Sequence, residues 1–279
     1  IGYDLGRIRS RMMGRRTTPP AYDQYIVAQS NHSCQEDRSS SFFIYLPNNS
    51  NLSIMTSPDA PGLSANAMTY LTLLLNIIDS KDWSTFNAIA LQNPKAFQAL
   101  SKVISTTSEF NGMSFLHAIV RNDAPVEVVA DVIRVCPSAP QTRDCLNRTP
   151  LHVAAGVGAD VRVIKFLAMA YPEACKVQDE DGRTPLHFAC DVDCRLFEGD
   201  ADAVRDPPTF EVVHALLSAS IAPASMEDED EMTPLEYAIV SDADVKVVKL
   251  LQKAAQKYLK KQHASKKIDE GRMKLGAAA

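Results

Sequence analysis

The sequence lacks an apolar run long enough to cross a bilayer. Its longest mainly apolar stretch covers only residues 67–78, whereas a membrane-spanning helix needs about twenty residues. Six cysteines occur in 279 residues without a CxxC pair, which is sparse for a disulfide scaffold and favours a reducing compartment. Glycine and proline are too few for a collagen-like or wholly disordered chain. The composition therefore predicts a globular protein without a membrane span, located in the cytoplasm or nucleus.

Motifs of the common catalytic sites are also missing. The sequence contains no phosphate-binding loop, no GxSxG elbow, no HExxH and no kinase-like catalytic word. The segment 156–158 (GVG) begins like a dinucleotide-binding fingerprint, but Val161 stands where the third glycine should be. His187, Cys190 and Cys194 are the best metal candidate, since imidazole and thiolates suit zinc. Packing of these three residues in a core is the favoured alternative, so we expect no cofactor and no catalysis.

Charge is strongly segregated along the chain, whose net charge is -5. Residues 1–16 carry +4 and residues 253–274 carry +6, while residues 17–252 carry -15. Such a distribution bears on partners rather than on fold. The basic ends, Arg7–Arg16 and Lys253–Lys274, leave nucleic-acid contact open. The helix macrodipole, which favours lysines near a helix C-terminus, is the preferred explanation of the C-terminal lysines.

A four-residue word recurs at a fixed period. It reads SFLH at 114–117, TPLH at 149–152, TPLH at 184–187 and TPLE at 233–236. The first two steps are 35 residues, and the third is 14 residues longer. The apolar pair that follows each word is displaced by the same amount in copy three. One insertion around residues 192–207 therefore explains both offsets.

Each copy reads as two short helices. The Thr or Ser that opens the word suits an N-cap, and proline suits the first helical position, where its missing N–H costs nothing. A second apolar stretch with helical spacing follows after a polar turn. Neither helix is long enough to bury its apolar face alone, so neighbouring copies must stack. The structural motif residues are Thr149, Pro150, His152, Thr184, Pro185, His187, Thr233 and Pro234.

These features resemble an ankyrin-repeat array, whose consensus is T-P-L-H-x-A at a period of about 33 residues. Four copies cover roughly residues 108–255. The array departs from the consensus in its period, in Phe115 in place of proline and in Glu236 in place of histidine. The resemblance implies an all-α helical-repeat solenoid. It also implies a structural histidine, bonded to its own motif and to neighbouring backbone, and partner binding at the inner helix face and turn tips.

The organisation expected from these patterns has four parts. Residues 1–63 read as a mostly disordered arm, in which the run 41–46 is either a docking strand or a β-prone stretch. Residues 64–107 read as an N-terminal helical cap and residues 108–262 as the array. Residues 263–279 read as a basic tail. Because the sequence begins without an initiator methionine, a preceding targeting peptide stays open.

Two turn tips of the array are acidic. The candidate partner-binding residues are Asp179, Glu180, Asp181, Glu227, Asp228, Glu229, Asp230 and Glu231. Solvated loops, or neutralisation by the chain's own Lys260–Lys267 tail, are the alternatives. The expected function is a non-catalytic scaffold or adaptor that binds a protein partner with a basic segment. An accessory protein that contacts nucleic acid through its basic termini is the less favoured alternative, and the oligomeric state stays open.

Overall fold

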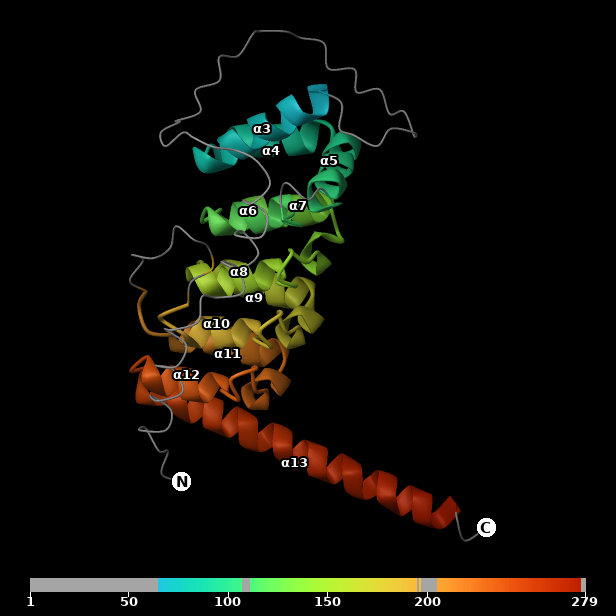
Figure 1. Ribbon diagram of the computed structural model, residues 1–279, viewed down its shortest axis with the longest axis vertical. Helices are drawn as coiled ribbons and strands as arrows, with labels where there is room; N and C mark the ends of the chain where they lie inside the picture. Colours follow the sequence, from blue (N-terminus) through green and yellow to red (C-terminus); the bar gives the residue numbers. More distant parts are fainter. Residues whose placement is uncertain (1–64, 107–110, 195, 197–204, 277–279) are drawn as a thin grey trace, which may run out of the picture.

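The computed structural model describes residues 65–106, 111–194, 196 and 205–276. The expected arm, its run 41–46 and the arginines of residues 7–16 lie outside the described residues. Within the described part of the chain the structure is helical and contains no strand. Helices stack in successive layers from the N-terminal end to the C-terminal end of the array (Figure 1). The expectation of an all-α solenoid is confirmed.

Four helix pairs form the array. Their bounds are α6 Phe115–Arg121 with α7 Val126–Val135, α8 Pro150–Val157 with α9 Val161–Ala170, α10 Pro185–Cys190 with α11 Phe210–Ala219, and α12 Pro234–Val240 with α13 Val245–Gly276. First helices contact first helices of the neighbouring pair, and second helices contact second helices. The 3-10 turns η2 (Ala139–Gln141), η3 (Pro172–Lys176) and η5 (Ala222–Ser225) follow α7, α9 and α11. The expected insertion lies between α10 and α11.

Three further helices cover the N-terminal end of the array. They are α3 (Ala65–Asp79), α4 (Trp83–Gln92) and α5 (Pro94–Thr106). The rings of Phe97 and Phe115 stack with centroids 4.9 Å apart, and Phe86 meets Phe97 edge-on at 5.8 Å. Aromatic burial of this kind joins α4 and α5 to α6, which α3 also contacts. The first repeat therefore does not expose its apolar side.

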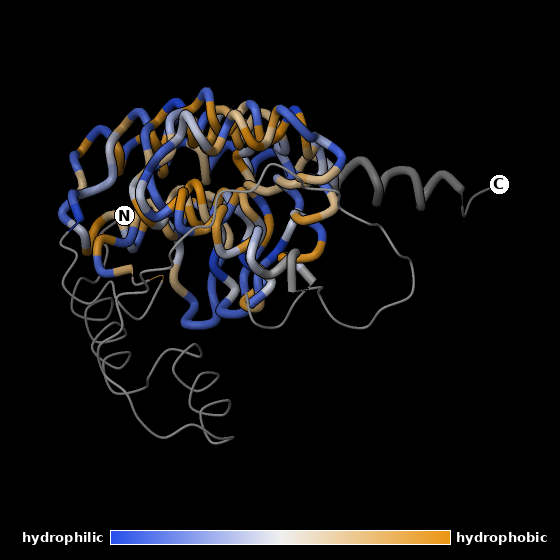
Figure 2. Tube along the Cα trace, turned by 90° about the horizontal axis from the view of Figure 1, so that it is seen from above, coloured by the Kyte–Doolittle hydropathy of each residue, from blue (hydrophilic) through white to orange (hydrophobic). Residues whose placement is uncertain are grey.

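The hydrophobic core is continuous through the array. Side chains of both helices in each pair are fully buried, among them Ile119, Val129, Ile164 and Val213. Viewed along the stack, apolar residues line the interior while hydrophilic residues form loops at the periphery (Figure 2). Stacking is what stabilises helices this short, because none has enough apolar surface to fold alone.

Helix α13 is longer than the repeat requires. Its first half packs on the array through Val247, Leu251 and Ala254, which are buried, but Leu259 is 50% exposed. The helix continues to Gly276 and projects beyond the stack (Figure 1). It crosses residue 262, the expected boundary of the array, without a break, because lysine, glutamine and alanine favour a helix. No helix in the described residues is both long enough and apolar enough to span a membrane.

Candidate functional site

Each first helix begins with a reciprocal contact between its N-cap and the residue three positions later. The backbone N–H of Thr149 donates to Nδ1 of His152 at 3.0 Å, and that of Thr184 donates to Nδ1 of His187 at 3.0 Å. Ser114 and His117 make the same contact at 3.1 Å. This satisfies an N–H that a helix start leaves without an intrahelical partner.

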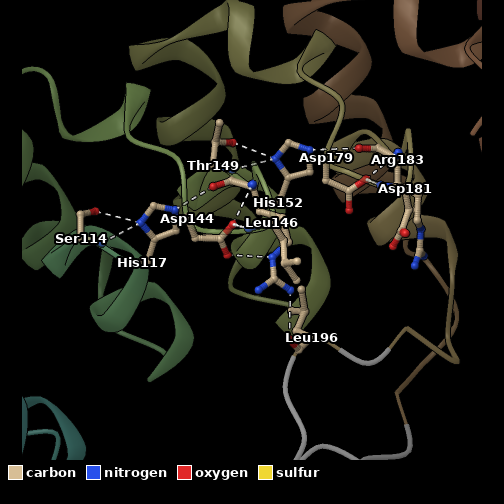
Figure 3. A network of polar contacts seen from close by, with 11 residues as sticks. Ser114, His117, Asp144, Leu146, Thr149, His152, Asp179, Asp181, Arg183 and Leu196 are labelled. Carbon is tan, nitrogen blue, oxygen red and sulfur yellow. Dashed lines mark hydrogen bonds and ion pairs between the residues drawn. The ribbon is translucent and has the colours of Figure 1, made fainter. Parts of the chain in front are cut away.

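The other ring nitrogen of each histidine reaches the next repeat. Nε2 of His117 lies 3.0 Å from the carbonyl oxygen of Arg148, and Nε2 of His152 lies 3.2 Å from that of Arg183. Because Nδ1 accepts a hydrogen bond, Nε2 carries the proton and donates. Figure 3 shows these contacts as a row that runs from Ser114 to Arg183. The repeated histidine thus links neighbouring copies by a hydrogen bond, as the resemblance implied.

Burial keeps these histidines neutral. Desolvation lowers the pKa of His117, lowers that of His152 to about 3 and lowers that of His187 to about 4. Both nitrogens of each ring are engaged, so none can act as a general base or a metal ligand without breaking the fold. Among the described residues no group of three or more His, Cys, Asp or Glu side chains could hold a metal ion.

The fourth copy replaces histidine by Glu236. Oε2 of Glu236 accepts from the backbone N–H of Thr233 at 2.8 Å and from its hydroxyl at 2.9 Å. A carboxylate thus supplies the acceptor that Nδ1 supplies elsewhere, but it has no proton to donate to a following repeat. The second helices of the other copies end before a 3-10 turn, whereas α13 runs on to Gly276 in the described residues, which fits this substitution.

Two of the eight candidate partner-binding residues shape the turns instead of facing solvent. Oδ1 of Asp179 accepts from the backbone N–H groups of Asp181 at 3.1 Å and Arg183 at 2.7 Å. Asp228 accepts from the backbone of Met232 at 2.9 Å and from the Tyr237 hydroxyl at 2.7 Å. Their exposed fractions are only 8% and 5%, and burial raises the pKa of Asp179 to about 6. These side chains hold the turns in shape.

A sequence signal for this role exists. An aspartate stands eight residues before the N3 residue in three copies, as Asp144, Asp179 and Asp228. Asp144 also accepts from the backbone of its own turn, from Leu146 at 3.0 Å and Arg148 at 2.8 Å. This recurrence marks the structural aspartate of these three turns.

The other six candidates are exposed and lie on two adjacent turns. We call them the acidic tip surface: Glu180, Asp181, Glu227, Glu229, Asp230 and Glu231. The backbone N–H of Glu229 donates to the carbonyl oxygen of Asp181 at 3.0 Å, and Nε2 of Gln178 donates to that of Glu227 at 3.2 Å. Gly182 permits this approach, because a Cβ there would lie 3.1 Å from the Glu229 nitrogen. The structure therefore joins the two acidic runs.

The basic ends are only partly described. Lys257, Lys260 and Lys261 are exposed on the projecting half of α13. This helix carries them away from the stack as a straight continuation of the last repeat (Figure 1).

Comparison with protein families gives a match over part of the array. Residues 137–189 match the family described as ankyrin repeats (many copies). The matched span contains helices α8, α9 and α10 with the two TPLH words. No curated protein matches the chain.

Proposed function

We propose that this chain, whose residues 137–189 match ankyrin repeats, is a non-catalytic scaffold. Its acidic tip surface receives a basic segment of a partner protein. Arrays of stacked repeats generally present extended surfaces for binding other proteins. In this chain the acidic tip surface gathers six exposed carboxylates on two adjacent turns. Its carboxylates belong to turns, where side chains stand clear of the packed helices.

The observation that carries the proposal is the hydrogen bond between Glu229 and Asp181. It brings the backbones of the two acidic turns into direct contact, and exposed charges act over roughly 8 Å at physiological salt. Two separate acidic loops would each attract a basic segment weakly. Adjacent loops add their fields, which favours a partner with several Lys or Arg residues in sequence.

A matched pair of variants tests this proposal. Glu180→Gln with Glu229→Gln removes two charges from the acidic tip surface, and Glu127→Gln with Glu211→Gln removes two exposed charges from second helices. Both variants therefore have the same net charge. Affinity capture with each variant and the unmodified chain, followed by mass spectrometry, should lose proteins with Lys/Arg-rich segments only for the tip variant. Identical captured sets for the two variants would contradict the proposal.

A second candidate rests on the exposed lysines of α13. A basic helix that projects from the fold could contact the phosphates of a nucleic acid, which is the accessory role considered above. Binding of a labelled 20-base-pair DNA over a salt series distinguishes this role. Phosphate contacts would give a steep linear fall of log affinity with log salt, and Lys257→Gln with Lys260→Gln would reduce that slope.

The cysteines support a location inside the cell, in the cytoplasm or nucleus. Cys136, Cys145, Cys175, Cys190 and Cys194 are all free thiols. Burial raises the pKa of Cys175 to about 12, so this thiol stays protonated and unreactive. Unpaired cysteines persist most readily in reducing compartments.

A further inference from the structure

The described residues of the insertion between α10 and α11 pack on the array. Leu196 is only 2% exposed, and its side chain occupies the space above Gly156 of α8. A Cβ on Gly156 would lie 2.4 Å from Cδ1 of Leu196, so the absence of a side chain at Gly156 leaves the room that the leucine occupies. Figure 3 shows Leu196 beside the row of repeat turns. A surface that a repeat array would offer to partners is thus occupied by the chain itself.

Arginines of consecutive copies hold the insertion. Nη1 of Arg148 donates to the carbonyl oxygen of Leu196 at 3.0 Å. Nη2 of Arg183 pairs with Oδ2 of Asp191 at 2.6 Å, at the start of the insertion. Arg148 and Arg183 each directly precede the N-cap threonine of their copy, so they form a row along the array. Arg205, at the far end of the insertion, donates to the carbonyl oxygens of Phe188 and Asp191.

The fit leaves several donors without an acceptor. Nε of Arg183 and both Nε and Nη1 of Arg205 are buried and make no hydrogen bond. A buried donor without a partner costs about 1–3 kcal/mol. Arg205 belongs to the insertion, so the unused donor of the array surface is Nε of Arg183. The insertion therefore matches this surface through Leu196 but leaves that donor without an acceptor, and an occupant with an additional carboxylate near Arg183 would fit better.

We propose that the surface formed by Arg148, Gly156 and Arg183 is an exchangeable peptide site, closed in this chain by its own Leu196. The occupant it fits is an extended partner segment with a leucine and a nearby carboxylate. The leucine occupies the space above Gly156, a backbone carbonyl binds Arg148, and the carboxylate binds the unused Nε of Arg183. The inference goes beyond the proposed function, because it concerns a different surface and an acidic rather than a basic segment.

Exchange must overcome the covalent link of the insertion to the array. A tethered segment acts at an effective concentration of about 1 mM, so an added peptide competes poorly with it. Weakening the tethered segment by removing the Leu196 side chain should therefore open the site. A peptide with the sequence of the insertion itself is therefore a suitable probe of the opened site.

The test measures binding of one labelled peptide to full-length chains. The probe is the sequence of residues 191–196 with serine in place of the cysteine. It should bind the Leu196→Ala chain at least tenfold more tightly than the unmodified chain, and a probe with alanine at its leucine position should lose this gain. Leu259→Ala, which truncates an exposed leucine of α13, is the matched control and should behave like the unmodified chain. Equal binding of the probe to the Leu196→Ala and unmodified chains, or no binding to either, would overturn the proposal.

Gly156→Ala is an independent test that does not depend on the Leu196 variant. Alanine is favoured in a helix, but its Cβ would displace Leu196. The backbone N–H of Cys194 donates to the Asp191 carbonyl oxygen at 3.3 Å. If the insertion is exchangeable, the unfolding midpoint of Gly156→Ala should equal that of the unmodified chain. The Cys194 amide should then exchange its hydrogen at least tenfold faster than in the unmodified chain. A large fall of the midpoint with unchanged exchange would show that the insertion is an integral part of the core, against the proposal. Neither outcome involves the acidic tip surface, so the two proposals fail separately.

Discussion

Nε2 of His187 lies 3.1 Å from the carbonyl oxygen of Met232 and thereby fastens α10 to the turn that opens the next copy. His187→Ala removes this bond and the acceptor for the Thr184 N–H together. Because both partners are buried, we expect a loss of about 3 kcal/mol in the free energy of unfolding, measured by urea titration. His263→Ala, at an exposed position of α13, should change it by less than about 0.5 kcal/mol. Equal effects of the two substitutions would refute the fastening role.

The same histidines predict a pH dependence of stability. The folded pKa of His152, about 3, lies below the unfolded value of about 6.5, so between these values the unfolded chain binds more protons. Stability should therefore fall as pH drops below about 6.5. Asp179, with its raised folded pKa of about 6, acts in the opposite direction, so the contribution of the histidine is isolated by a variant.

His152→Gln is that variant, since glutamine keeps an acceptor at the N3 position. The stability difference between the unmodified chain and this variant should shift by about 2 kcal/mol, to the disadvantage of the unmodified chain, between pH 7 and pH 5. Urea titrations at both pH values measure the shift. A difference that does not change with pH would mean that His152 is not buried in its neutral form.

Alanine substitution at two glycines with positive φ distinguishes the stability cost of backbone strain from that of a close contact. Gly182 (φ 75°) would place a Cβ 3.1 Å from the Glu229 nitrogen, whereas Gly158 (φ 70°) has no atom within 4 Å of that position. Alanine at either site should cost about 1 kcal/mol for its left-handed conformation. Gly182→Ala should cost about 1 kcal/mol more by separating the two acidic turns. Thermal denaturation measures both, and equal losses would argue against the close contact between the turns.

The two kinds of acidic residue in the tips should respond differently to truncation. Asp228→Ala removes the acceptor of two backbone N–H groups and of the Tyr237 hydroxyl, so we expect a loss of about 2 kcal/mol. Glu229→Ala, at an exposed position of the same turn, should change stability by less than about 0.5 kcal/mol. Comparable unfolding midpoints for the two variants would show that Asp228 does not organise the turn.

Much of this architecture was predictable because its determinants are local and repeated. The 35-residue period, the threonine–proline helix starts and the late apolar pair of copy three locate the helices and the insertion without any long-range information. The structural role of the histidine followed from the resemblance to ankyrin repeats that this recurrence indicates. Short words that repeat in register constrain a solenoid strongly, since each copy contacts only its neighbours.

The exceptions are side chains whose roles depend on contacts elsewhere. Asp179 and Asp228 lie in acidic runs typical of a solvated tip, and the backbone geometry of the turn shows that they face inward. Their recurrence eight residues before the N3 residue is the one sequence signal for this role. The sequence locates the insertion, but the seat of Leu196 on Gly156 depends on how residues 40 positions apart meet in space. Helix α13 exceeds the repeat because nothing in residues 245–270 stops a helix once it has started.

The most direct test of the proposed scaffold is the association rate of a synthetic Lys/Arg-rich peptide, measured by stopped-flow fluorescence over a salt series. The unmodified chain should associate quickly at low salt and lose rate as salt rises, because exposed charges steer the encounter. Glu180→Gln with Glu229→Gln should slow association severalfold at low salt and flatten the salt dependence, while Glu127→Gln with Glu211→Gln should match the unmodified chain. Identical rates and slopes for the two double variants would contradict the assignment of the acidic tip surface as the docking site.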